Sequence, residues 1–135
     1  MTAAAAVLLA ALAVAGCTHE ESDPLDGTRW RLSEWTLSSL RPTDFTITAA
    51  FARGEVSGGG AVNSYSGPYR LGSDNAITAG PFSSTEIAGP PAAMRAERAY
   101  MTLLGQARSY ALAGDRLTLF DAGGNESLVF AAGAG

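Results

Sequence analysis

The sequence is informative in what it lacks: lysine, a second cysteine, and a histidine inside the part that can fold. Its 135 residues carry nine basic side chains, all arginine, and thirteen acidic ones, so the net charge is −4. The arginines form no run and therefore supply no basic stripe, which nucleic-acid phosphates demand. We expect no nucleic-acid partner.

The lone cysteine and the lone histidine, Cys17 and His19, both precede the predicted domain. Ser-His and Cys-His nucleophile pairs are therefore unavailable, and no His or Cys remains to bind zinc. The acidic residues are scattered without the spacing of a calcium loop. A single cysteine also leaves no disulfide, so core packing alone must stabilise the fold. The sequence predicts a protein that is not an enzyme, with no catalytic residue, metal site or cofactor.

Residues 1–16 have no charged side chain, and Ala3 to Val14 form an unbroken apolar run. This run is too short to span a bilayer, which needs roughly 20 residues, but it suits the hydrophobic region of a secretory signal peptide. It ends in the sequence VAGC, which resembles a lipobox, the signal after which a cysteine is lipidated and becomes N-terminal. We therefore expect a signal peptide over residues 1–16 and a lipid on Cys17.

A diacylglyceryl group with a further acyl chain such as palmitate would hold the protein on the extracytoplasmic side of the cell membrane, because two or more chains anchor stably. Residues 17–24 are polar and acidic and are predicted to be a flexible tether, in which His19 is solvated. Two alternatives stay open. Residues 13–15 also fit ordinary signal cleavage, which would give a secreted protein, and the segment could be an uncleaved helix.

From Leu25 onward, short runs of alternating apolar residues are separated by glycine. One stretch, Ala92 to Ala107, has helical periodicity instead and follows two prolines, which are tolerated in the first turn of a helix. These patterns predict one α+β domain over residues 25–132, with one helix packed against a curved antiparallel sheet or incomplete β-barrel. We expect a monomer. The predicted strands cover residues 28–35, 45–51, 55–57, 64–71, 75–78, 109–113, 116–120 and 127–131.

Three places in the domain are candidate sites. The run Gly58 to Gly60 leads into a strand and has no lysine beside it, so a tight corner with close backbone approach is favoured over a phosphate loop. Asn63 is interpreted as a turn residue, with ligand contact as the alternative. Glu97 shares a helix face with methionine and leucine side chains, where a carboxylate must find donors. We expect these from Thr85, Asn63 or backbone amides, and Glu97→Gln should then destabilise the fold.

Four longer stretches follow one another along the domain. They are LDGTRWRL (25–32), GGGAVNSYSGPY (58–69), SSTEIAGPPAAMRAERAYMTLL (83–104) and SYALAGDRLTLFDAGG (109–124). In order and spacing they resemble the motifs of the META domain family, which includes HslJ-like bacterial lipoproteins. The resemblance implies a helix packed against, or plugging, an open barrel. It also makes Asn63, Tyr65, Thr85 and Glu97 motif residues with structural or binding roles.

The chain departs from the family pattern at Val62 and Gly89, where relatives often have cysteine. If those cysteines approach each other in relatives, Val62 and Gly89 should lie close in space here, with Cα atoms no more than about 7 Å apart. Any thiol or disulfide chemistry of relatives does not carry over to this chain.

The resemblance supplies no catalytic mechanism, and it associates the family with envelope stress and antibiotic tolerance. Together with Cys17 it predicts a membrane-anchored, non-catalytic module that binds another envelope protein. The alternative is a binder of a small molecule or lipid in the barrel interior. A continuous apolar cavity of roughly several hundred Å3 would favour that ligand. A filled interior with an exposed apolar patch would favour a protein partner.

Overall fold

The computed structural model describes residues 22–37 and 39–133. The predicted signal peptide, Cys17 and His19 lie outside the described residues. Within these residues, nine strands, one α-helix and two short 3-10 helices follow one another. They are β1 (Thr28–Trp35), η1 (Pro42–Asp44), β2 (Thr48–Ala52), β3 (Glu55–Gly59), β4 (Ser64–Leu71), η2 (Ser73–Asn75), β5 (Ile77–Ala79), β6 (Ser83–Ser84), α1 (Pro91–Gln106), β7 (Ser109–Ala113), β8 (Arg116–Phe120) and β9 (Glu126–Ala132).

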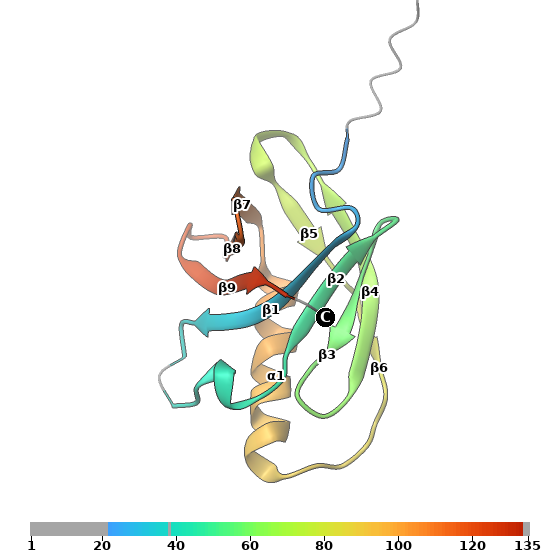
Figure 1. Ribbon diagram of the computed structural model, residues 1–135, viewed down its shortest axis with the longest axis vertical. Coiled ribbons are helices and arrows are strands. Elements are labelled where there is room, and N and C mark those ends of the chain that lie inside the picture. Colours follow the sequence, from blue (N-terminus) through green and yellow to red (C-terminus); the bar gives the residue numbers. More distant parts are fainter. Residues whose placement is uncertain (1–21, 38, 134–135) are drawn as a thin grey trace, which may run out of the picture.

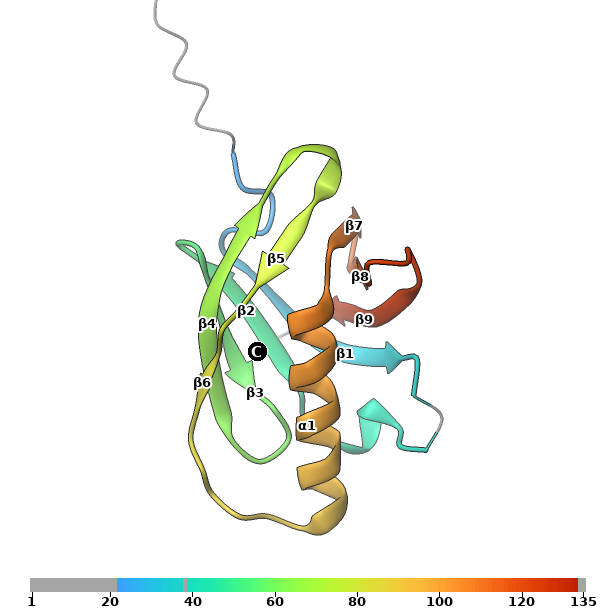
Figure 2. The same cartoon turned by 180° about the vertical axis from the view of Figure 1, so that it is seen from behind.

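The strands form one antiparallel sheet in the order β5-β4-β3-β2-β1-β9-β8-β7, and β6 pairs with β4 beside β5. The sheet curls until its two outer strands meet, as Figures 1 and 2 show. An isolated bridge joins Ala76 to Ser109 there, and the N–H of Ile77 donates to the carbonyl of Arg108 at 3.0 Å. The result is a nearly closed barrel with a single helix, so the predicted α+β class and incomplete barrel are confirmed.

Helix α1 lies along the barrel and contacts β5 and β9 (Figure 2). Its buried face follows helical spacing through Ala93, Glu97, Tyr100 and Leu104. At the end of the helix, the guanidinium of Arg108 donates to the carbonyl of Gly105 in the last turn and to that of Ala107, the residue that follows the helix. No helix in the described part of the chain has the length and hydropathy of a membrane span.

The core is built from the inward positions of the strands, as the period of two requires. Ile47, just before β2, and Ala49 and Phe51 within it are all buried, which confirms the predicted alternation. The strand itself begins at Thr48 and not at residue 45, because η1 occupies the preceding residues and Ile47 makes only an isolated bridge to Gly60.

Most predicted elements agree with the structure, and four of the strands, β1, β4, β7 and β8, agree residue for residue. Strand β6 was missed. It is two serines long, and so short a polar pair carries no alternating pattern; its existence depends on β4 lying beside it. The predicted close backbone approach is confirmed at Gly58, where an added Cβ would lie 2.2 Å from the carbonyl oxygen of Thr48, but Gly58 and Gly59 lie within β3 and pair with β4 and do not form the predicted corner.

The fold starts within the stretch predicted to be a flexible tether. The carboxylate of Asp23 accepts the N–H groups of Leu25 at 2.8 Å and Asp26 at 3.2 Å, as well as the hydroxyl of Tyr69 on β4. The end of the predicted tether is therefore bound to the barrel, because a local turn and the hydrogen bond from Tyr69 on β4 fix Asp23.

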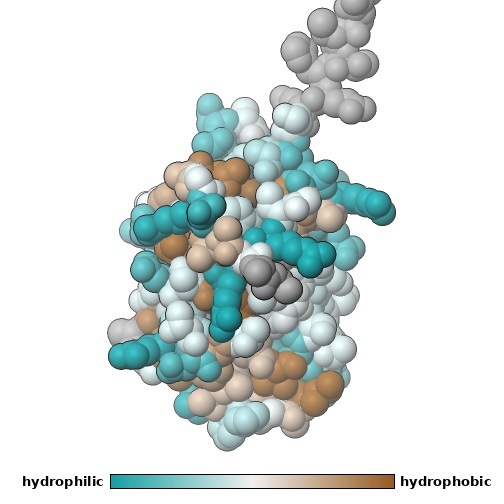
Figure 3. All heavy atoms as spheres, viewed as in Figure 1, coloured by the Kyte–Doolittle hydropathy of each residue, from teal (hydrophilic) through white to brown (hydrophobic). Residues whose placement is uncertain are grey.

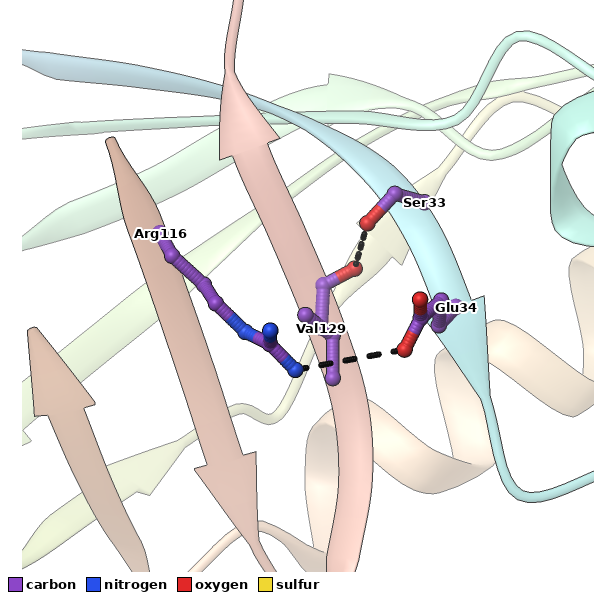
Figure 4. Close-up of polar contacts among 4 residues, drawn as sticks. All are labelled: Ser33, Glu34, Arg116 and Val129. Carbon is purple, nitrogen blue, oxygen red and sulfur yellow. Dashed lines mark hydrogen bonds and ion pairs between the residues drawn. The ribbon is translucent and has the colours of Figure 1, made fainter. Parts of the chain in front are cut away.

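Figure 4 shows polar side chains on the outer face of β1, β9 and β8, where the pairing of β1 and β9 is irregular. Strands β1 and β9 change register between Leu32 and Glu34, and the hydroxyl of Ser33 donates to the carbonyl of Val129 at 3.0 Å. Arg116 and Glu34 reach toward each other across β9, with 3.9 Å between Nη2 and Oε2. Val129 is buried beneath them although it faces outward.

Candidate functional site

The carboxylate of Glu97 forms the centre of the candidate site. Its side chain projects from α1 and is only 9% exposed. Oε1 accepts the N–H groups of Val62 at 3.2 Å and Asn63 at 2.5 Å, and Oε2 accepts the side-chain Nδ2 of Asn63 at 2.7 Å. Of the donors predicted for Glu97, Asn63 and backbone amides are therefore present. Thr85 is not among them and bonds to Asn63 instead.

The loop between β3 and β4 is shaped around this carboxylate. Ala61 has a φ of +99°, in the region that only glycine adopts without strain. This turn aims two successive N–H groups at one oxygen, an arrangement that binds anions. Gly60 leaves the space for it, since an added Cβ would lie 3.0 Å from Oε1 of Glu97. The carboxyl group of Glu97 is thus held by two peptide N–H groups and the Asn63 amide, and the ion pair found among the described residues, Arg116–Glu34, lies elsewhere.

The side chain of Asn63, which Glu97 holds in place, also forms hydrogen bonds to the segment that follows β6. Its Oδ1 accepts the hydroxyl of Thr85 at 2.9 Å and the N–H of Ile87 at 2.7 Å, and its Nδ2 also donates to the carbonyl of Ile87 at 3.1 Å. The amide thus bonds to Ile87 as a neighbouring strand would. Thr85 closes the arrangement by accepting the N–H of Ser64 at 3.2 Å. Every donor and acceptor of the Asn63 side chain is used, so the segment Thr85–Gly89 is fixed to the barrel.

Ile87 was missed by the sequence analysis. Its side chain is 63% exposed, while its backbone is held on both sides by Asn63. The sequence offers one indication of its exposure: Ile87 is the one large apolar residue between Ser83 and Pro91. A hollow of about 300 Å3 that is open at the surface lies beside it and is lined by Ser84 to Ala88, Met94, Asn63 and Glu97.

Tyr65 belongs to the barrel interior and makes no bond to Asn63 or Glu97. Its hydroxyl donates to the carbonyl of Thr48 at 2.7 Å and lies 2.5 Å from the hydroxyl of Tyr100. Because the single proton of Tyr65 goes to Thr48, Tyr100 donates to Tyr65. Burial raises the pKa of both hydroxyls above the ordinary tyrosine value, so both stay neutral. The structure therefore brings together Asn63, Thr85 and Glu97, and it places Tyr65 apart.

Val62 and Gly89 lie in contact, as predicted. A Cβ on Gly89 would be 3.4 Å from the Cβ of Val62 and 2.7 Å from its Cγ2. The Cα atoms are then within the reach of about 7 Å that a disulfide requires. The branched side chain of Val62 occupies the space beside Gly89, so a valine and a glycine fill a volume that two smaller side chains could share.

The site holds no constellation for metal binding. Residues 22–37 and 39–133 contain no cluster of three or more His, Cys, Asp or Glu side chains. Cys17, the predicted lipid attachment point, is outside these ranges. The hydrogen bonds between Glu97, Val62 and Asn63 hold the loop between β3 and β4 in one shape.

Comparisons with known proteins bear on fold and family. The family model described as the META domain matches residues 23–134. An NMR structure of a protein from Burkholderia xenovorans is similar, with 24% identity, a TM-score of 0.68, and coverage of 82% of this chain and 85% of that one. A crystal structure of a DUF4847 family protein from Bacteroides vulgatus has 12% identity, a TM-score of 0.63, and coverage of 83% and 96%. No curated protein gave a significant match.

The two solved structures are similar in fold alone. The match of the family model spans most of the described residues and includes both the Asn63 loop and the helix that carries Glu97. Two of the stretches that led to the resemblance, residues 58–69 and 83–104, meet at the site described above. This chain belongs to the META domain family.

Proposed function

We propose that this protein is a membrane-anchored, non-catalytic module of the cell envelope that binds another protein through the segment Thr85–Gly89, in a role linked to envelope stress or antibiotic tolerance. The observation that carries the proposal is Ile87, exposed to 63% on a backbone that buried Asn63 holds. Ala88 and Met94 line the same hollow, and Figure 3 shows hydrophobic residues gathered at this end of the molecule. An exposed apolar patch of this kind marks a contact surface.

The interior supports a protein partner more than an internal ligand. Tyr65, Tyr100 and Phe130 pack edge to face, with ring centroids 5.4 and 6.3 Å apart. Phe51 and Tyr69 do the same at 5.0 Å. Aromatic side chains thus occupy the volume that a small molecule or lipid would need, which speaks against the alternative of a ligand inside the barrel.

The position of the segment suits an anchored protein. The described chain enters at one end of the barrel, whereas the connection from β6 to α1 lies at the other (Figures 1 and 2). A lipid on Cys17 would therefore leave Thr85–Gly89 facing away from the membrane. Glu97, the buried carboxylate of the site, uses both oxygens for internal hydrogen bonds. That supports a positioning role over an acid–base role, which requires access to a substrate proton.

The test is photo-crosslinking in intact cells with a crosslinking amino acid at position 87. Leu112, exposed to 39% on β7, is the matched control position. We expect one envelope protein to be captured from position 87 and not from position 112. With the crosslinking amino acid moved to the neighbouring exposed position 88, which lines the same hollow, Ile87→Asp should abolish the adduct, whereas Leu112→Asp should leave it. Equal capture from both positions, or an adduct that survives Ile87→Asp, contradicts the proposal.

The anchor is tested separately by mass spectrometry of the mature protein. We expect Cys17 to be N-terminal and to carry acyl chains, and Cys17→Ala to release the protein from the membrane fraction. Cleavage after residue 15 would give a secreted protein, and an unmodified Cys17 would remove the lipoprotein assignment.

A further inference from the structure

A cavity of about 470 Å3 opens at the end of the barrel where the described chain enters. It lies between the entry segment, the end of β4, the turn from β4 to β5, and β7. Its volume is in the range of small-molecule sites. The residues that line it are Ser22 to Pro24, Tyr69, Leu71 to Asn75 and Tyr110.

The charged side chains of this cavity are both carboxylates, Asp23 and Asp74, and no arginine is among its lining residues. Asp23 is held in place by two backbone N–H groups and the hydroxyl of Tyr69. Three hydrogen bonds leave part of the acceptor capacity of this carboxylate unused. Carboxylates in a partly enclosed cavity attract cations, because walls of low dielectric constant concentrate their field.

The floor of the cavity is aromatic. Tyr69 and Tyr110 line it and are themselves only 4% and 8% exposed. Burial raises the pKa of both hydroxyls, and the negative charge of Asp23 raises them further, so neither tyrosine becomes a competing anion. Aromatic rings beside carboxylates attract organic ammonium groups, which gain both charge attraction and contact with the π face.

From the combination of this open cavity, two carboxylates with no arginine among the lining residues, and two tyrosines, we propose that this cavity binds an ammonium group carried by a small amine or a lipid headgroup. Asp23 and Asp74 provide the counter-charge, and Tyr69 and Tyr110 provide the apolar contact. A bare metal ion is a poorer match, since it would gain nothing from the rings.

The source of the ammonium group rests on the proposed lipid anchor. Five peptide units separate Cys17 from Ser22 at the cavity, and an extended chain covers at most about 3.6 Å per residue. An anchored barrel would therefore hold the cavity within about 18 Å of the membrane surface. The ammonium of an ethanolamine headgroup would then be within reach.

The test is a titration of the full chain, purified in non-ionic detergent, with ethanolamine hydrochloride against sodium chloride of equal ionic strength. NMR signals of the Tyr69 and Tyr110 rings report binding. We expect saturable shifts with ethanolamine alone. Asp74→Asn removes a charge from an exposed residue whose φ of +57° suits asparagine, and it should weaken binding roughly fivefold.

Asp44→Asn is the matched control, because Asp44 is an exposed carboxylate in η1, away from the cavity. It should leave the affinity unchanged. A second arm compares nanodiscs of phosphatidylglycerol with nanodiscs that also contain phosphatidylethanolamine. Shifts in the second kind identify a lipid headgroup as the source, and shifts with free ethanolamine alone identify a soluble amine.

Two results would overturn the proposal. One is the absence of a saturable shift with ethanolamine in either arm, and the other is an equal loss of affinity in Asp44→Asn and Asp74→Asn. Either result leaves the crosslinking at position 87 and the modification of Cys17 untouched, so failure here is distinct from failure of the proposed function.

Discussion

The two ends of the barrel each use one carboxylate to fasten a segment that belongs to no strand. At the end where α1 begins, Glu97 accepts three hydrogen bonds from Val62 and Asn63. At the end where the chain enters, Asp23 accepts three from Leu25, Asp26 and Tyr69. The number of bonds is the same, but Glu97 is buried and Asp23 is half-buried.

This difference in burial determines what each carboxylate can do. Water reaches Glu97 less readily than Asp23, because Glu97 is buried and only 9% exposed at the hollow that it lines, so the loop and the segment at Ile87 are held more tightly. Water can replace a donor that Asp23 loses, and Asp23 also faces an open cavity. The end of the barrel at Glu97 therefore presents a surface of fixed shape, whereas the end at Asp23 presents a carboxylate that can still accept hydrogen bonds from a ligand. The predictions below test this contrast, from the largest expected effect to the smallest.

Glu97→Gln should destabilise the fold by about 3 kcal/mol. Glutamine keeps one acceptor oxygen for the N–H groups of Val62 and Asn63, but its amide N–H2 then faces the Nδ2 donor of Asn63. Rotating the Asn63 amide would instead break both of its bonds to Ile87. Urea unfolding at neutral pH measures the loss.

Glu86→Gln is the matched control for that measurement, because Glu86 is exposed in the neighbouring segment. It should leave the urea midpoint unchanged. If Glu97→Gln unfolds at the same midpoint as the wild type, Glu97 does not anchor the loop, and the contrast between the two ends is lost.

Val62→Cys combined with Gly89→Cys should form a disulfide and stabilise the fold by about 2 kcal/mol. The contact between the two positions supplies the short Cβ distance that the bond needs. The experiment uses a Cys17→Ser background, oxidised glutathione, and thiol titration to follow pairing. Gly89→Cys alone should be destabilising, because Val62 fills the space. Two free thiols after oxidation would show that the loop and the segment do not stay together.

The barrel could be predicted from local patterns in the sequence, whereas the contact between Asn63 and Glu97 could be predicted only from the chemistry of a buried carboxylate. Alternating residues such as Ile47, Ala49 and Phe51 identify a buried strand face because that pattern is local. The contact between Asn63 and Glu97 was anticipated because a carboxylate on an apolar helix face requires donors, and the choice of Asn63 was one of several left open.

What the sequence could not provide is the position of residues that act through long-range neighbours. Ile87 is held outward by an asparagine 24 residues earlier in the chain, and no local pattern encodes that bond. The cavity at the entry end depends on Asp23 folding back onto Tyr69, 46 residues away. A polar acidic stretch gives no sign of such a contact, and it was interpreted as a flexible tether.

Above pH 10 the fold should lose stability through its tyrosines. Burial raises the pKa of Tyr65 and Tyr100, so between pH 10 and their folded pKa values the unfolded chain releases protons that the folded chain keeps. The stability is therefore present below about pH 10 and falls as pH rises, by about 1.4 kcal/mol per pH unit for each buried tyrosine. The chain has no lysine, so tyrosines dominate this range. Tyr100→Phe should flatten the profile in thermal unfolding from pH 8 to 11, and an unchanged slope would contradict its burial.

Tyr69→Phe should cost about 1 kcal/mol, less than Glu97→Gln, because the variant loses one hydrogen bond to a carboxylate that water can reach. The ring stays in place against Phe51, so packing is preserved. Urea unfolding measured beside Glu97→Gln gives the comparison directly. Equal losses in the two variants would show that the entry end is as rigid as the other.

The smallest effect is expected between the two ends, on the outer face. Glu34→Gln should change stability by less than about 0.5 kcal/mol, because both partners of the Arg116 ion pair are more than half exposed and 3.9 Å apart. Arg116→Ala should cost more, since the side chain of Arg116 extends from β8 toward β9 and its guanidinium ends beside Val129 (Figure 4), where its apolar stem would also shield this face from water. Unfolding in low and high salt separates the two contributions. High salt should remove only the stabilisation that comes from charge. A loss of unfolding free energy in Arg116→Ala that persists in high salt therefore identifies packing by the apolar stem of Arg116. A loss that disappears would show that the ion pair, and not the stem, stabilises this face.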